Sequence, residues 1–405
     1  MKANCLFLPL ILISAFSMGQ FKNDNVLYKT IYPQDLCKEL QQSKGYLILD
    51  VRSKGEFADT SSFPVYNLGH LENAMNIDVS ELPKRLSEIS DYKDKRIYVY
   101  CSHSQRSRRS SKMLADSGFT NVINVNGGFS AIRRLAEDNC IKNLIKTTVG
   151  YNILSVAQLC TKLNETAKPF LLDVRSDSAF KHIDLRANVN AMGNFKNAIN
   201  IPLADLIKRL TEIPQNKEII IIDVSGDQAA EAANLLYNNN FRNISILLEG
   251  VERMFHSDSK DLACINDKYL SPVKYKIISS VDLKRLKETS PDFLPLDIRS
   301  SEEFNNKHKD TYRNIGHLVN AINVPLAKLL AGTAEIVQYK NKPVLIYAFT
   351  GGKDPHEAAQ MLMNRGFTNV MVLSGGLFNV RWTSGNVYGY TSLMNFVEDV
   401  PAENL

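Results

Sequence analysis

The chain has little of what marks several classes of protein. Its 405 residues include one tryptophan, and its formal net charge is only +5. It has no long basic run and no basic stretch interleaved with aromatic residues, which argues against a nucleic-acid partner. The composition, 44% hydrophobic and 22% charged, is that of an ordinary globular protein long enough for two or three hydrophobic cores.

Long apolar runs are also absent beyond the N-terminus. Lys2 and an apolar run over residues 5–16 precede Ser17 and Gly19, the small residues of a cleavage site after Gly19. This pattern predicts a secretory signal peptide over residues 1–19, because the run is shorter than the roughly 18 residues that a membrane anchor needs. We therefore expect an exported protein, periplasmic or secreted, with no membrane span after cleavage.

Three segments of the chain repeat one another. Each contains Leu-Asp-Val-Arg or Leu-Asp-Ile-Arg, then a stretch with Asn-Ala-x-Asn, and then a glycine-containing turn. A spacing of 247 residues separates Asp50 from Asp297 and also His70 from His317, so the first and third copies share one register. The motifs lie at 49–52, 172–175 and 296–299, at 69–77, 197–201 and 316–324, and at 126–128, 249–250 and 374–376.

Within each copy, short apolar runs such as 46–49 alternate with helical patterns such as 79–89. This alternation is typical of an α/β domain with a central, mostly parallel sheet flanked by helices. Copies of about 120 residues fit the usual size of a domain. We therefore expect three tandem domains and a C-terminal tail, over residues 25–145, 149–268, 273–388 and 389–405.

Cys101 lies between a predicted strand and a predicted helix of the first copy. Residues 96–100 are β-branched and aromatic and indicate a short buried strand, whereas residues 106–117 indicate a helix. The polar turn between them argues against the alternative that Cys101 is a buried structural thiol. His103, in this turn, is interpreted as a solvated residue rather than as a proton carrier.

The order of these motifs resembles that of the rhodanese family of sulfurtransferases. The resemblance implies that residues 101–106 wrap the Cys101 sulfur with backbone N–H groups and that Ser107 begins the helix. Such an environment favours the thiolate, which is the nucleophilic form. Supporting, structural roles are implied for Asp50, Arg52 and His70. Substrate contacts are implied for Ser102, His103, Ser104, Gln105, Arg106 and Ser107.

The resemblance also implies a two-step sulfur transfer with ping-pong order and with no cofactor or metal. Cys101 takes a sulfane sulfur from an anionic donor such as thiosulfate, attracted by Arg106 with Arg108 and Arg109, and passes it to a thiol or cyanide acceptor. Four residues separate Cys101 from Arg106, as in sulfurtransferases, whereas related phosphatases have five. Ser104 departs from the family's usual glycine, and we expect a cost in activity if this position needs a positive φ.

The second and third copies lack the nucleophile. Asp223 stands at the position of Cys101 in the second copy, with Gln228 in place of the loop arginine, and its carboxylate would repel anionic donors. Ala348 stands there in the third copy, unless the alignment shifts by one residue to Phe349. The roles left to these degenerate domains are structural support, docking of a protein partner, or shaping of the donor site in the first domain. An alternative function is a non-catalytic binding or scaffold protein built from three such modules.

Two cysteines recur together in the first two copies and are absent together from the third. Cys37 is equivalent to Cys160, and Cys140 is equivalent to Cys264. This predicts the disulfides Cys37–Cys140 and Cys160–Cys264, which export to an oxidising compartment permits. The alternative is that all four are small buried hydrophobic residues. With both pairs formed, Cys101 is left as the free thiol.

Overall fold

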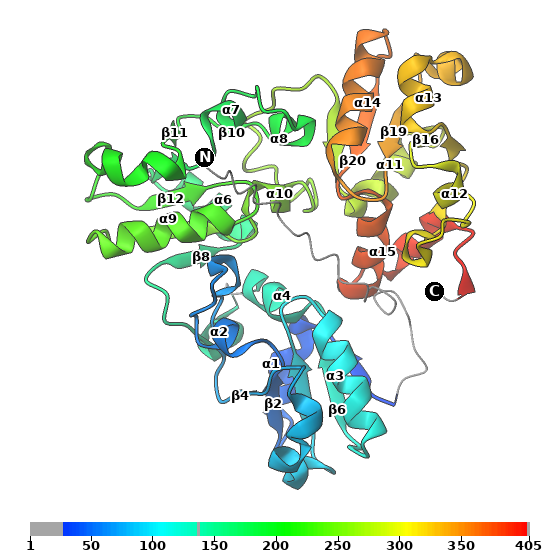
Figure 1. Ribbon diagram of the computed structural model, residues 1–405. Helices are drawn as coiled ribbons and strands as arrows, with labels where there is room; N and C mark the ends of the chain where they lie inside the picture. The colour runs from blue at the N-terminus through cyan, green and yellow to red at the C-terminus, as the bar shows by residue number, and fades with distance from the viewer. Residues whose placement is uncertain (1–26, 136–137, 403–405) are drawn as a thin grey trace, which may run out of the picture.

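The computed structural model describes residues 27–135 and 138–402. The predicted signal peptide, residues 1–19, lies outside the described residues. Figure 1 shows three α/β domains gathered around a common centre, with the first domain below and the second and third above it. In the part of the chain that the structure describes, no helix has both the length and the apolar character needed to cross a bilayer.

Each domain is built on a central sheet of five strands, all parallel, where the sequence predicted a mostly parallel sheet. In the first domain the strand order is β1-β6-β5-β2-β4, and all neighbours run parallel. The strands are β1 (Lys29–Ile31), β2 (Leu47–Asp50), β4 (Met75–Asn76), β5 (Ile97–Tyr100) and β6 (Val122–Val125). The helices are α1 (Pro33–Gln41), α2 (Lys54–Phe57), α3 (Gln105–Asp116), α4 (Gly128–Arg134) and α5 (Asn139–Leu144).

The second domain repeats this plan with the order β11-β9-β12-β13-β8. Its sheet strands are β8 (Asn152–Leu154), β9 (Phe170–Asp173), β11 (Ile199–Asn200), β12 (Ile219–Ile222) and β13 (Ile244–Leu247). Its helices are α6 (Val156–Asn164), α7 (Asp177–Phe180), α8 (Ala187–Ala191), α9 (Asp227–Asn238) and α10 (Gly250–Met254).

The third domain has the order β15-β20-β19-β16-β18. Its sheet strands are β15 (Lys276–Ile278), β16 (Leu294–Asp297), β18 (Ile322–Asn323), β19 (Val344–Tyr347) and β20 (Val370–Leu373). Its helices are α11 (Leu283–Thr289), α12 (Ser301–Phe304), α13 (Leu326–Ala331), α14 (Lys353–Asn364) and α15 (Gly376–Asn386).

The central strands are buried and mostly apolar because helices cover both faces of each sheet. All four residues of β5 are buried, and so are the four isoleucines of β12. Burial of one such side chain contributes about 1.5–3 kcal/mol. The pairing of β5 with both β2 and β6 makes it a central strand, so the residue that follows Tyr100 emerges at the carboxyl edge of the sheet.

Each domain also contains a two-stranded antiparallel ribbon. One strand of each ribbon lies at the Gly-His motif or at its equivalent. The ribbons are β3 (His70–Leu71) with β7 (Ile145–Lys146), β10 (Asn194–Phe195) with β14 (Tyr269–Leu270), and β17 (His317–Leu318) with β21 (Val397–Glu398). The segment set apart in the sequence as a tail, 389–405, therefore carries β21 and the 3₁₀ helix η8 (Thr391–Phe396). It is the equivalent of the segments that close the first two domains.

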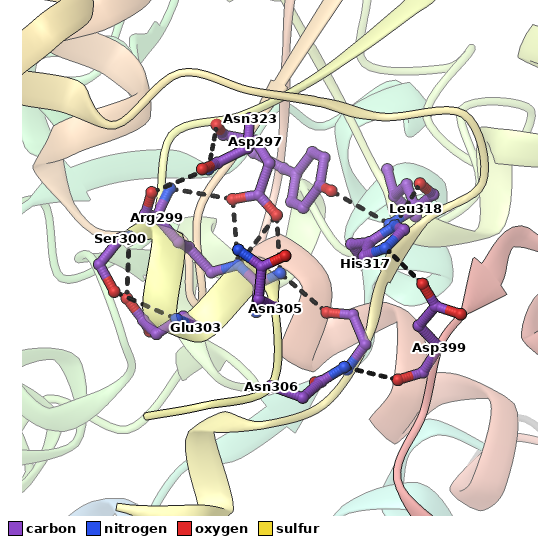
Figure 2. Close-up of polar contacts among 12 residues, drawn as sticks. Asp297, Arg299, Ser300, Glu303, Asn305, Asn306, His317, Leu318, Asn323 and Asp399 are labelled. Atoms are coloured by element: carbon purple, nitrogen blue, oxygen red, sulfur yellow. Dashed lines mark hydrogen bonds and ion pairs between the residues drawn. The ribbon is translucent and has the colours of Figure 1, made fainter. Parts of the chain in front are cut away.

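The Asp-x-Arg motif joins the end of a sheet strand to the Gly-His turn. In the first domain Arg52 Nη2 donates to Asp50 Oδ2 at 2.7 Å and to the carbonyl of Gly69 at 2.6 Å, with both ionic side chains fully buried. Figure 2 shows the third domain's version, in which Arg299 reaches Asp297. An ion pair that holds its own loop in place serves structure, as expected for this motif.

The structure contains both predicted disulfides. Cys37 and Cys140 join α1 to α5 with their Cα atoms 6.3 Å apart. Cys160 and Cys264 join α6 to the segment before β14 with their Cα atoms 5.8 Å apart. Each bond links two distant parts of one domain, and Cys101 is the free cysteine of the described residues.

Candidate active site

Cys101 sits directly after β5, at the carboxyl edge of the first sheet. Its Sγ accepts a hydrogen bond from the backbone N–H of Ser104 at 3.2 Å and lies 3.7 Å from the hydroxyl of Ser107. The side chain is 1% exposed and packs in the same apolar cluster as Val99. The polar turn was expected to argue against a buried thiol, but the Cys101 sulfur is buried. The turn surrounds a thiol that is buried on its other sides.

Ser104 occupies the position where the sequence suggested a need for positive φ, and its φ is 97°. The equivalent residue of the second domain is Gly226, with φ 94°. A side chain in this region costs free energy, but the Ser104 hydroxyl accepts a hydrogen bond from the N–H of Gly127 at 2.5 Å. The serine thus fastens the cysteine loop to the glycine turn before α4, which a glycine could not do.

Arg106 is held by a carboxylate that the sequence reasoning missed. Its guanidinium donates to both oxygens of Glu56, at 2.5 and 2.7 Å, and to the hydroxyl of Ser102 at 2.9 Å. Glu56 is also the third residue of a capping box with Ser53 at the start of α2. Burial alone would raise the pKa of Glu56, but the hydrogen bonds and charge of Arg106 outweigh it and hold the pKa below its usual value.

A signal for Glu56 was present in the repeat. Glu303 is its equivalent in the third copy and forms the same capping box with Ser300. The second copy has Ala179 at this position and also lacks the loop arginine, so in that copy both members of the ion pair are absent. With Arg106 paired in this way, the expected attraction of anionic donors is weaker than a free guanidinium would give.

The His103 side chain is 44% exposed, so it is partly solvated as the sequence suggested, and it also makes polar contacts with the protein. Its Nε2 lies 3.1 Å from the hydroxyl of Ser130 on α4 and 3.2 Å from Oε1 of Glu249 in the second domain. The same Glu249 carboxylate accepts hydrogen bonds from Arg134 of the first domain at 2.9 and 3.0 Å. Reasoning within one repeat could not find this contact, because it joins two domains.

The remaining predicted site residues divide between the loop and its surroundings. Ser107 lies inside α3, which begins at Gln105, and its hydroxyl donates to the carbonyl of Ser104 at 3.0 Å. Arg108 donates to Asn126 and to the carbonyl of Gly385 in the third domain, at 3.2 and 3.1 Å. Arg108 thus contacts another domain, contrary to the expectation that it faces a donor.

His70 packs away from the loop. Its ring stacks on Phe57 with the centroids 4.2 Å apart, and its Nδ1 lies 3.0 Å from the carbonyl of the same residue. In the third domain His317 stacks on Phe304. Its Nε2 lies 3.1 Å from a carboxylate oxygen of Asp399, a contact that Figure 2 shows. Both histidines hold the two-stranded ribbon near a short helix, which fits a supporting role.

Comparison with known families finds the same family in all three repeats. The model of the rhodanese-like domain matches residues 33–135, 155–255 and 280–381, together more than half of the chain. The chain belongs to the rhodanese-like family. It is 35% identical over 105 residues to the uncharacterized protein YqhL of Bacillus subtilis, a match covering 24% of this chain and 75% of that protein.

Other relatives share only one domain or a weak overall likeness. A tRNA uridine(34) hydroxylase of Cronobacter sakazakii is 33% identical over 86 residues, which is 20% of this chain and 25% of that protein. A thiosulfate sulfurtransferase structure from Pseudomonas aeruginosa covers 86% of this chain and 66% of its own, at 15% identity and a TM-score of 0.22. A rhodanese-like domain protein of Staphylococcus aureus covers 25% and 89%, at 29% identity and a TM-score of 0.22.

The second rhodanese-like domain keeps the cradle of N–H groups but fills it with its own carboxylate. Asp223 is 1% exposed and accepts hydrogen bonds from Gly226 at 2.8 and 2.9 Å, from Gln228 at 2.9 Å and from Ala229 at 3.2 Å. Burial raises its pKa to about 6 even though these N–H groups favour the charged form. A carboxylate of the protein itself therefore occupies the cradle of N–H groups in this domain.

The loop of the third rhodanese-like domain carries Ala348 and Phe349 and has no cysteine. The N–H of Leu377 donates to the carbonyl of Ala348 at 3.0 Å, as the N–H of Phe129 does to the carbonyl of Cys101 at 2.7 Å. This shared bond places Ala348, rather than Phe349, opposite Cys101. Phe349 packs against Phe378 and, with a guanidinium 4.9 Å from its ring centroid, under Arg313.

Proposed function

We propose that this protein is an exported sulfurtransferase with a single active site at Cys101 in the first rhodanese-like domain. The observation that carries the proposal is the position of Cys101 Sγ, which lies at a sheet edge within 3.2 Å of the Ser104 N–H. The Cys-x4-Arg spacing and the family membership support the same chemistry. The Ser104 N–H that donates to this sulfur would also donate to a persulfide formed on it.

The proposed reaction has two steps. The Cys101 thiolate attacks the sulfane sulfur of thiosulfate, a new S–S bond forms, and the old S–S bond breaks so that sulfite leaves with the electron pair. An acceptor thiolate or cyanide then attacks the terminal sulfur of the persulfide, which regenerates the Cys101 thiolate. In this proposal Arg106 and the Ser102 hydroxyl bind the anionic donor.

The proposal places the protein in an oxidising compartment, periplasmic or extracellular. The predicted signal peptide and the two disulfides support this location, because disulfides persist where thiols are not kept reduced. The pairing of all the other described cysteines leaves Cys101 without a nearby cysteine to scramble with.

A second candidate function is a non-catalytic module that binds a partner protein. The loops of the second and third domains favour it, because Asp223 and Ala348 stand there in place of the reactive thiol. This alternative assigns no chemistry to Cys101.

One experiment separates the two candidates. The protein is incubated with thiosulfate, freed of excess donor, and examined by intact mass without reduction. The enzyme predicts a mass increase of one sulfur atom that is absent in Cys101→Ser and is removed by cyanide with formation of thiocyanate. An adduct that persists in Cys101→Ser, or no adduct at all, overturns the proposal and leaves the binding module.

A further inference from the structure

Glu249 adopts a backbone conformation that is unfavourable for a residue other than glycine. It stands where the first and third domains have Gly127 and Gly375, with φ of 79° and 70°, and its own φ is 62°. A side chain other than that of glycine costs free energy in this left-handed region of the backbone. Contacts of the Glu249 side chain in the folded protein must offset that cost, and the cradle of N–H groups in the second domain does not supply them, because Asp223 occupies it.

The Glu249 carboxylate makes its closest contacts with the first domain. Arg134 donates to both oxygens at 2.9 and 3.0 Å, and His103 lies 3.2 Å from Oε1, whereas Arg253 of the second domain is more distant at 3.8 Å. Burial opposes ionisation, but the charge of Arg134, the hydrogen bond with His103 and the charge of Arg253 outweigh it and hold the pKa of Glu249 well below its usual range. The carboxylate is therefore charged throughout the neutral range.

His103 connects this carboxylate to the sulfur. Its backbone directly precedes the Ser104 N–H that donates to Cys101 Sγ. Ser104 has a φ of 97°, so the loop is held in a conformation that it would otherwise leave. Two contacts hold this loop: the contact of His103 with Glu249, and the hydrogen bond from the Gly127 N–H to the Ser104 hydroxyl.

We propose that Glu249 of the second domain is a positioning residue for the Cys101 loop of the first domain and acts through His103. The degenerate second domain thus shapes the reactive loop of its neighbour. Figure 1 shows the geometry that permits this, with α4 of the first domain facing α10 of the second near the centre of the molecule. The proposal rests on the proposed sulfur transfer only for its kinetic consequence, since the effect on the loop exists without any substrate.

The first test measures the loop without substrate. Glu249→Gly removes the carboxylate and introduces the residue type that this position has in the other two domains, so the backbone keeps its conformation. Amide exchange in the peptide containing residues 102–106 should accelerate by about tenfold. The matched control is Glu212→Gln, which breaks an exposed ion pair with Arg209 in the same domain and should leave that exchange unchanged. Equal exchange in Glu249→Gly and the unaltered protein overturns the proposal.

The second test asks whether the effect passes through His103. In the thiosulfate reaction Glu249→Gly should lower kcat by about tenfold with little change in KM, because Arg106 and Glu56 are untouched. Glu249→Gln, which keeps an oxygen near His103, should recover part of the rate. In a His103→Ala background the Glu249→Gly substitution should add nothing, and an undiminished further loss overturns the proposal. If the unaltered protein forms no persulfide, the proposed function fails and amide exchange alone decides the role of Glu249.

Discussion

Arg106 and Glu56 form a bidentate ion pair, with guanidinium nitrogens 2.5 and 2.7 Å from the two carboxylate oxygens. The Glu56 side chain is 8% exposed and that of Arg106 is 28% exposed. The arginine that would meet an anionic donor is therefore already matched by a carboxylate. This pairing sets both the stability of the loop and its preference for donor charge.

Substitutions of Arg106 and of Glu56 should change the KM for thiosulfate in opposite directions. Arg106→Ala should raise the KM for thiosulfate well above that of the unaltered protein, whereas Glu56→Gln should lower it, because it releases the arginine's charge. A neutral sulfane-sulfur donor should show neither shift. The measurement is steady-state kinetics with both donors, and equal losses for both in Arg106→Ala would mean that Arg106 mainly holds the loop together.

A stability control accompanies these variants. Arg106→Ala leaves a buried carboxylate without its partner and should cost about 2–3 kcal/mol in the free energy of unfolding. The double variant Arg106→Ala with Glu56→Gln should recover part of that loss, since no unpaired charge remains. Urea unfolding of the single and double variants measures the difference.

Two changes at Ser104 separate backbone strain from the side-chain hydrogen bond. Ser104→Ala keeps the positive φ and loses the bond from Gly127, so it should destabilise the first domain by about 1 kcal/mol. Ser104→Gly loses the same bond but removes a backbone cost of about 1 kcal/mol, so its stability should lie close to that of the unaltered protein. Urea unfolding checks this order, and a glycine variant less stable than the alanine variant would contradict it.

Asp223 should make the second domain more stable in mild acid. Its pKa in the folded protein is raised to about 6 by burial, whereas an unfolded aspartate titrates near about 4. Between these values the folded state binds more protons, so this contribution is fully present below about pH 4 and is lost as the pH rises through about 6. The loss amounts to roughly 3 kcal/mol.

Asp223→Asn is the matched variant for this prediction, because an amide of the same size cannot titrate. The stability of the unaltered protein relative to Asp223→Asn should fall between about pH 4 and about pH 7. Hydrogen exchange of peptides from β12 and α9 reports on the second domain alone. A difference that stays constant across this range would rule out the titration of Asp223 as its source.

Alkylation of the unreduced, denatured protein should label Cys101 and no other cysteine of the described residues. The bonds Cys37–Cys140 and Cys160–Cys264 protect the other four. Each bond closes a loop of about one hundred residues, which is worth up to about 4–5 kcal/mol in the chain-entropy model. Peptide mapping by mass spectrometry identifies the labelled residue, and label on Cys37 or Cys264 would show that its disulfide is not formed.

The sequence by itself determined the repeated architecture, because its signals are local or recur at fixed spacing. Apolar runs of four residues predicted the buried parallel strands, and the repeated Asp-x-Arg motif predicted the strand ends that it occupies. The shared presence and absence of cysteines predicted which of them lie close together. The position of Ser104 in a turn requiring positive φ was also readable, from the glycine that it replaces.

Only the tertiary structure decided what surrounds the reactive sulfur, because those contacts join residues far apart in the chain. Glu56 meets Arg106 across fifty residues, and Glu249 reaches His103 from another domain. From the sequence, the Asp223 carboxylate was expected to repel anionic donors. The structure shows that this carboxylate accepts hydrogen bonds from the N–H groups of its own loop. Composition and spacing give the charge of a side chain, but its partner is set by how the domains pack, and that packing decides whether the charge meets a substrate or another residue.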